Sequence, residues 1–99
     1  LIGGHTMGVQ CVRVLTKRGW IVLASDASHF YENMEATAPF PIVYSLADMV
    51  DGYAKLRDLA ESPLHVIPGH DPLVMQRYPG ARDDIADVVV RLDVAPKMD

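Results

Sequence analysis

The sequence predicts an α/β fold, of which these 99 residues form about half. Short stretches rich in β-branched and other apolar residues stand on both sides of one long amphipathic helix, which is the pattern of a sheet layered with helices. The predicted order is strand, strand, helix, strand, strand. One long helix and four short strands are too few to cover both faces of such a sheet.

The first two strands are expected to form a hairpin. Residues 8–16 are rich in β-branched side chains and predict a strand, and Lys17-Arg18-Gly19 predicts a tight turn. Trp20 to Ala24 is apolar without interruption, which is typical of a strand covered on both faces. Asp26-Ala27-Ser28 follows directly at the end of this strand.

The helical part begins with a short helix predicted over 31–35, and Ala38-Pro39-Phe40-Pro41 breaks the chain after it. The clearest helix is predicted over 45–60, with Ser45 and Asp48 in the spacing of a capping box. Apolar residues at helical spacing predict its buried face: Leu46, Met49, Val50, Tyr53, Leu56 and Leu59.

Three further elements follow the long helix. Residues 64–68 predict a short strand, which ends in the loop Gly69-His70-Asp71-Pro72. A turn of helix is expected over 73–77. Residues 86–94, with three successive valines at the centre, predict the last strand.

The composition excludes several classes of partner. Apolar residues make up 49% of the chain and charged residues 22%, as in ordinary globular proteins. The formal net charge of -4 and the lack of a basic run argue against nucleic acid and anionic membrane surfaces as partners. The longest apolar run, Trp20 to Ala24, is far below the roughly 20 residues of a membrane span. The single cysteine, Cys11, excludes a disulfide framework and favours a reducing, cytoplasmic setting.

Three potential metal ligands share one context. His5, Asp26 and His70 each lie in a loop at or near the end of a predicted strand, and Gly4 and Gly69 precede the two histidines. Strand ends hold a side chain rigidly, and glycine lets the backbone approach an ion or a substrate closely. Two histidines and a carboxylate with an open position suit a catalytic zinc or a related divalent ion.

The segments GGHTMG, LASDASHFYENM and VIPGHD, in this order, resemble the C-terminal half of a metallo-β-lactamase-fold hydrolase. More narrowly, they resemble the lactonase branch, which includes N-acyl-homoserine lactonases and 4-pyridoxolactonase-like enzymes. The family's first motif, His-x-His-x-Asp-His, does not occur in the 99 residues. The resemblance therefore implies that residues 1–99 are the C-terminal part of a single domain with an αββα sandwich, whose N-terminal half lies upstream of Leu1.

The resemblance also implies a site with two divalent metal ions, of which zinc is the expected one. His5 would complete the first metal site, Asp26 would bridge the two ions, and His70 would belong to the second. A metal-bound hydroxide would open the ring of a small-molecule lactone or ester, with Asp26 as the carrier of the proton to the leaving oxygen. These residues alone are expected to bind metal poorly and to be inactive, because the N-terminal half supplies four of the seven ligands.

Two positions depart from the family pattern. Gly3 and Met7 replace prolines that are common in the Gly-His-Thr loop. His29 stands where the best-known homoserine lactonases have a tyrosine that polarises the substrate carbonyl. His29 can donate a hydrogen bond in the same way, so we treat it as a candidate catalytic residue, with a surface or supporting role as the alternative. This departure weakens the prediction of an acyl-homoserine substrate more than the prediction of lactone or ester hydrolysis.

The candidate residues also have simpler interpretations that involve no metal. Asp26 or Ser28 could cap the helix that follows, and His70 could be a turn residue. Asp71 could orient His70 or only start a turn. His65, which alternates with apolar neighbours, is predicted to be a strand residue outside the site.

Three alternatives to a lactonase remain at this stage. The first is a thioester hydrolase of the same fold, similar to glyoxalase II, and the second is a single-iron dioxygenase. The third is a non-catalytic binding module. One sheet face is expected to be exposed in these residues, which predicts either instability or a partner chain, such as a second copy in a homodimer.

Overall fold

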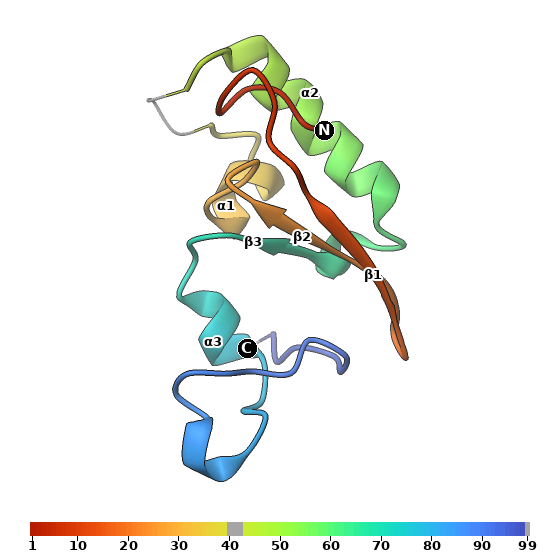
Figure 1. Cartoon of the computed structure of the whole chain (residues 1–99), viewed down its shortest axis with the longest axis vertical. Helices are drawn as coiled ribbons and strands as arrows, with labels where there is room; N and C mark the ends of the chain where they lie inside the picture. Colours follow the sequence, from red (N-terminus) through yellow and green to blue (C-terminus); the bar gives the residue numbers. More distant parts are fainter. Residues whose placement is uncertain (40–42, 99) are drawn as a thin grey trace.

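The computed structural model describes residues 1–39 and 43–98, and it shows a small mixed α/β unit built on one three-stranded sheet. The sheet order is β1 (Val12–Thr16), β2 (Gly19–Ser25), β3 (Val66–Pro68). β1 and β2 form the predicted antiparallel hairpin, and β3 pairs parallel to β2. Figure 1 shows the sheet at the centre, with α2 (Leu46–Leu59) on one side and α3 (Leu73–Arg77) on the other.

The hairpin turns over two residues because Gly19 adopts a positive φ of 104°, a conformation that side chains with a Cβ rarely take. Thr16 pairs with Gly19 across the turn, and the Thr16 hydroxyl donates a hydrogen bond to the Gly19 carbonyl. The first strand is shorter than the predicted range of 8–16, because Val9 leaves it and forms an isolated bridge with Ile2.

The long helix begins one residue later than predicted, and Ser45 is its N-cap. The Ser45 hydroxyl accepts a hydrogen bond from the Asp48 backbone N–H, as the capping pattern requires. The other half of the predicted box differs, since the Ser45 N–H donates to the Gly4 carbonyl, 2.8 Å away. The start of α2 is thereby tied to the N-terminal loop.

The core lies on both faces of β2, whose side chains alternate between them. Val22 and Ala24 pack with Met49, Tyr53 and Leu56 of α2. On the opposite face, Ile21 packs with Ile67 and Tyr78. The buried stripe of α2 is narrower than predicted: Leu46 is 60% exposed, and Val50 and Leu59 are also exposed. Met49, Tyr53 and Leu56 form the fully buried centre of the stripe, and these three exposed residues flank it.

Both short helices form where the sequence predicts them, as α1 (Tyr31–Glu35) and α3. The predicted strand over 64–68 begins only at Val66, because Ser62 caps a single 3₁₀ turn over Pro63–His65. Of the predicted break at 38–41, Phe40 and Pro41 lie outside the described residues.

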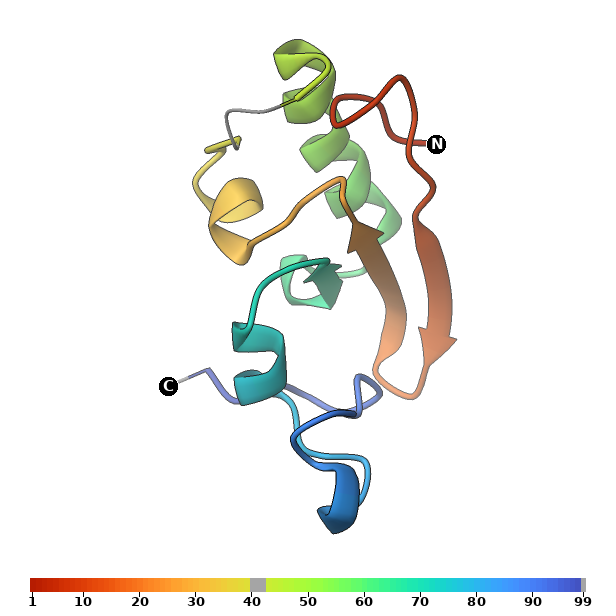
Figure 2. The ribbon, with the colours of Figure 1, turned by 60° about the vertical axis from the view of Figure 1, so that its left-hand side comes forward.

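The predicted strand over 86–94 is wrong. A 3₁₀ turn occupies Asp83–Ile85, and the segment that follows makes only an isolated bridge between Val90 and Gly80. β-Branched residues form a strand when a neighbouring strand accepts their backbone hydrogen bonds and a core accepts their side chains. Here the segment runs below α3 instead of along the sheet, and Val88 is 70% exposed (Figure 2).

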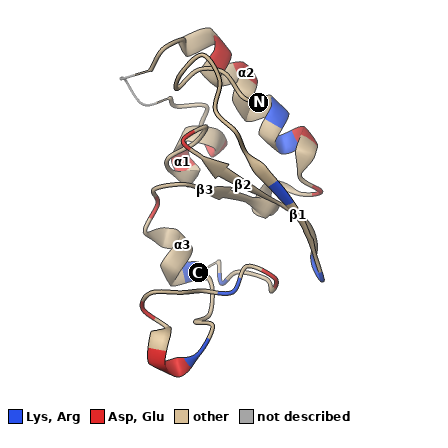
Figure 3. Cartoon of the chain, in the orientation of Figure 1, with Lys and Arg blue, Asp and Glu red and all other residues tan. Residues whose placement is uncertain are grey.

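Charged residues of both signs lie on α2 and the C-terminal segment, whereas β1 carries only the basic Arg13, and β2 and β3 are uncharged (Figure 3). Among the described residues, no helix combines the length and the apolar character needed to cross a bilayer.

Arg18, at the tip of the hairpin, ties the C-terminal segment to the sheet. Its guanidinium donates hydrogen bonds to the Tyr78 hydroxyl at 2.7 Å and to the carbonyls of Leu92, Val94 and Leu64 at 3.1, 3.2 and 3.0 Å. Five N–H donors in a rigid fork suit this kind of multiple anchoring.

We expect Arg18→Ala to lower the free energy of unfolding by roughly 2–4 kcal/mol, because several carbonyls lose a charged donor and the aliphatic stem loses its packing. Arg13→Ala is the matched control: Arg13 stacks on Trp20 at 4.1 Å, and such an exposed contact contributes only about 0.5–1 kcal/mol. Urea denaturation of the two variants measures the difference. Equal losses would contradict the anchoring role of Arg18.

Candidate metal centre

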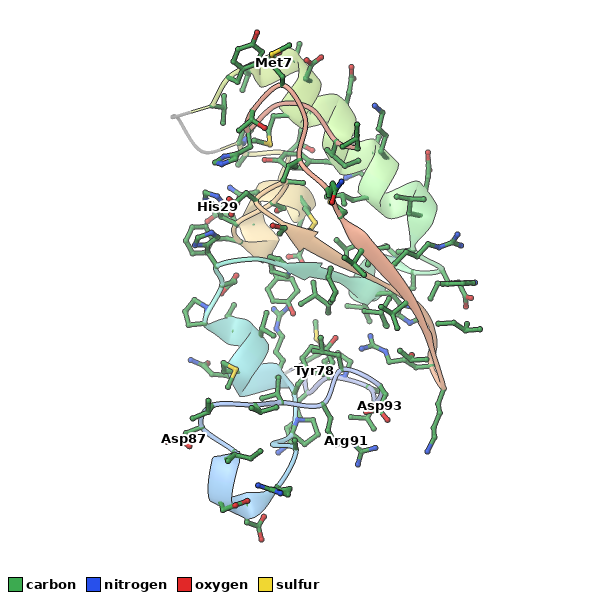
Figure 4. The ribbon with its side chains drawn as sticks, viewed as in Figure 1. Met7, His29, Tyr78, Asp87, Arg91 and Asp93 are labelled. Atoms are coloured by element: carbon green, nitrogen blue, oxygen red, sulfur yellow. The ribbon has the colours of Figure 1, made fainter. Side chains whose placement is uncertain are left out.

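Four polar side chains meet at the ends of β2 and β3. Asp26 follows β2 and His70 follows β3, and the parallel pairing of these strands brings both ends to one edge of the sheet. His29 lies three residues after Asp26, in the loop that leads to α1 (Figure 4). His5 comes from the N-terminal loop, which the Ile2–Val9 bridge closes beside α2.

The turn that presents Asp26 depends on a strained residue, Ser25, and on one close backbone approach. Ser25 has a positive φ of 51°, a strained conformation for a residue with a side chain. A Cβ on Gly69 would lie 2.4 Å from the Ser25 carbonyl oxygen, so only glycine fits there. Backbone hydrogen bonds from Gly69 to Ser28 and from His70 to His29 then hold the two loops side by side.

Gly4 positions His5 in a similar way. It has a φ of 118°, and a Cβ at this position would lie 2.5 Å from the backbone nitrogen of Met49 in α2. At both Gly4 and Gly69 the group approached closely is the backbone of another element, whereas the sequence predicts an approach to an ion or a substrate. These glycines bring the loops together and so bring the histidines to Asp26.

The Asp26 carboxylate is the centre of the cluster. His70 Nε2 lies 2.7 Å from Asp26 Oδ1, which is hydrogen-bond length. His29 Nε2 lies 3.4 Å from the same oxygen, and His5 Nε2 lies 3.4 Å from Oδ2. The rings also contact one another: the His29 and His70 centroids are 4.2 Å apart, and those of His5 and His29 are 5.5 Å apart.

The electrostatics of the cluster favour an ionised Asp26 carboxylate and a neutral His29 imidazole. The hydrogen bond from His70 lowers the pKa of Asp26, and the nearby His5 and His29 act in the same direction. Burial lowers the pKa of His29, and the neighbouring His70 lowers it further, because both disfavour the imidazolium. Neutral imidazole and ionised carboxylate are the forms that bind metal ions.

The structure brings together His5, Asp26 and His70, the three ligands predicted from the sequence, and adds His29 to them. Among the described residues, the group whose ligand atoms all lie within 4.8 Å of one another is His5, Asp26 and His29. The sequence hypothesis treated His29 as a substrate contact and not as a ligand. The Asp-x-x-His spacing was the available signal, since a turn of three residues returns a side chain to the same side.

The contacts of Asp26, Asp71 and His65 bear on the simpler interpretations of these residues. Asp26 does not cap α1, because Asp71 Oδ2 accepts the hydrogen bond from the Tyr31 N–H. Asp71 Oδ1 accepts another from the Leu73 N–H, so Asp71 organises the turn before α3. His65 lies outside the cluster, as predicted, and its Nδ1 is 3.0 Å from the Trp20 carbonyl oxygen.

A cleft of about 540 Å³ opens between α1 and α3, and none of the four cluster residues lines it. Its lining includes Phe30 and Asp71, the residues that directly follow His29 and His70, together with Leu73 and an Arg77 side chain stacked at 4.0 Å on Tyr31. This volume is in the range of small-molecule sites.

Comparison with known proteins adds no identification, since no protein-family model and no curated protein matches the chain. The fold and the cluster define a small α/β unit with a candidate metal centre, and its function has to be argued from that centre.

Proposed function

We propose that this chain forms part of a metal-dependent hydrolase of the metallo-β-lactamase type, which opens the ring of a lactone. The observation that carries the proposal is the convergence of His5, His29 and His70 on the Asp26 carboxylate, from three loops far apart in the sequence. A solvated surface does not need three imidazoles on one carboxylate, whereas a metal centre does.

The donor atoms fit the metals that the resemblance implies. Imidazole nitrogen with carboxylate oxygen suits zinc and its neighbours in the first transition series, and is poorly suited to magnesium or calcium. His5, Asp26 and His70 would hold the ions, with the remaining ligands from a His-x-His-x-Asp-His motif. Bound metal would polarise the substrate carbonyl and activate the attacking water at neutral pH.

In the proposed reaction, residues of this chain also give room to the substrate and supply a proton to the leaving oxygen. The cleft between α1 and α3 offers room for the substituent of the lactone next to the reacting carbonyl. When the ring opens, the carbon–oxygen bond to the ring oxygen breaks and this oxygen takes up a proton. Asp26 lies at the centre of the cluster and is the proposed carrier of that proton. The resemblance places His29 against the substrate carbonyl, but its position favours another role, argued below.

The exposed face of β1 supports the proposed αββα architecture. Val12 and Val14 pair with Leu23 and Ile21, so they lie on the sheet face opposite α2, where they are 55% and 42% exposed. In the proposed architecture, the N-terminal half of the domain covers this face.

The proposal is tested on the native protein that contains these residues. Chelation should abolish hydrolysis and added zinc should restore it, and a substrate panel should show lactones hydrolysed faster than thioesters of matched acyl length. A preference for thioesters would overturn the lactonase assignment in favour of an enzyme similar to glyoxalase II. Metal-loaded protein that hydrolyses neither class would overturn the enzymatic assignment.

A further inference from the structure

The distances to Asp26 divide the three histidines into two kinds. In a tetrahedral zinc site with bonds of about 2.0–2.2 Å, neighbouring ligand atoms are separated by about 3.3–3.6 Å. His5 Nε2 lies 3.4 Å from Asp26 Oδ2 and His29 Nε2 lies 3.4 Å from Asp26 Oδ1, and both distances are close to this separation. One ligand atom from each of the three residues can be chosen so that all three lie within 4.8 Å of one another, as one shared ion requires. His70 Nε2, at 2.7 Å, is at hydrogen-bond distance instead.

We infer that His29 is a metal ligand, and that His5, Asp26 and His29 together hold one divalent ion of the zinc class. This assignment differs from the resemblance, which gives the position of His29 a contact with substrate. It deepens the proposed function and rests on it for the roles of His5 and Asp26 as ligands. With His29 as a ligand, one ion binds to residues of this chain alone. The family's ligand set, by contrast, predicts weak metal binding by these residues, because four of its seven ligands lie in the N-terminal half.

Burial supports this division. The side chains of His5 and His29 are 28% and 21% exposed, whereas that of His70 is 55% exposed. Two shielded imidazoles on opposite oxygens of one carboxylate leave the remaining coordination positions open on the solvent side. His70 then acts as a positioning residue for this ion: its N–H donates to Asp26 and fixes the orientation of the carboxylate.

The class of ion follows from the donors. Two imidazole nitrogens and one carboxylate, with open positions, suit Zn²⁺, Co²⁺ or Fe²⁺. Mg²⁺ and Ca²⁺ prefer sites built from oxygen atoms, so they should not compete for this one.

Cobalt titration of the 99-residue chain tests the inference, because bound Co²⁺ has visible absorption bands that report its ligands. We expect one equivalent of Co²⁺ to bind, Zn²⁺ to displace it, and excess Mg²⁺ to leave it in place. His29→Gln should weaken cobalt binding at least about tenfold and change the visible spectrum, as expected for the loss of a ligand. His65→Gln is the matched control and should bind cobalt like the unchanged chain, since His65 lies outside the cluster.

A second measurement does not depend on a variant that folds. Two-bond ¹H–¹⁵N spectra of the unchanged chain should show the Nε2 resonances of His5 and His29 shifting together on addition of one equivalent of Zn²⁺. A His29 Nε2 resonance that does not move, or a His29→Gln variant with unchanged cobalt affinity and spectrum, would overturn the inference, as would the failure of the chain to bind cobalt. These readouts are independent of hydrolysis, so a protein that binds the ion through His29 but hydrolyses no lactone would contradict only the proposed function.

Discussion

Asp26→Asn is expected to reduce metal-dependent hydrolysis by about three orders of magnitude or more, on the order of 4 kcal/mol in the activation free energy. Asparagine has nearly the same shape as aspartate, but it lacks the negative charge on which His5, His29 and His70 converge. The amide can present only one oxygen, so the variant loses one of the two carboxylate atoms that the histidines contact. The same substitution removes the proposed proton carrier. Metal content and lactone hydrolysis of the native protein are the measurements.

Asp87→Asn is the matched control, because it makes the same chemical change on an exposed residue at the far end of the molecule from His29 (Figure 4). It should leave both metal content and hydrolysis unchanged. Full metal content and activity in Asp26→Asn would contradict the proposed centre. If the protein serves as a non-catalytic binding module, Asp26→Asn should leave partner binding intact.

Gly4→Ala is expected to lower the free energy of unfolding by roughly 3 kcal/mol or more and to separate His5 from Asp26. The new Cβ would meet the Met49 backbone nitrogen and Cα at 2.5 Å, and the φ of 118° would strain alanine even in open space. The backbone of α2 cannot move aside cheaply, because Met49 is fully buried in the core. The loop that carries His5 should therefore lift away from α2.

Gly8→Ala, in the same loop, provides the control. Its Cβ would meet only Leu1 Cδ2 at 3.9 Å, which is an ordinary van der Waals contact. Urea denaturation should show little change for Gly8→Ala and a large loss for Gly4→Ala. Cobalt affinity should follow the same order. Equal stability of the two variants would show that the loop does not depend on its close approach to α2.

The sequence predicts best the elements that are specified by local interactions. Ser45 and the apolar stripe define α2 without reference to the rest of the chain, because capping and helical spacing act within two turns. The β1–β2 hairpin is similar, since the two-residue turn Lys17-Arg18, followed by Gly19, places its strands side by side. These elements form as predicted, within a few residues at their ends.

The prediction fails where structure depends on distant partners. The valines at 88–90 have the composition of a strand, but among the described residues no strand pairs with them, and so this segment bridges only to Gly80. Leu46 and Leu59 lie on the predicted apolar face of α2 and still remain exposed, because burial depends on which other elements reach the helix. Neither outcome is visible in local sequence.

The sequence by itself determined which side chains were candidates for the metal centre: His5, Asp26 and His70, each in a loop next to a strand end or a glycine. Only the tertiary structure decided how these residues meet and that His29 joins them. The physical reason is that ligand distances depend on three loops held together by backbone contacts. Gly69 packs against Ser25, and Gly4 packs against α2, across separations of about 45 residues that no local pattern encodes.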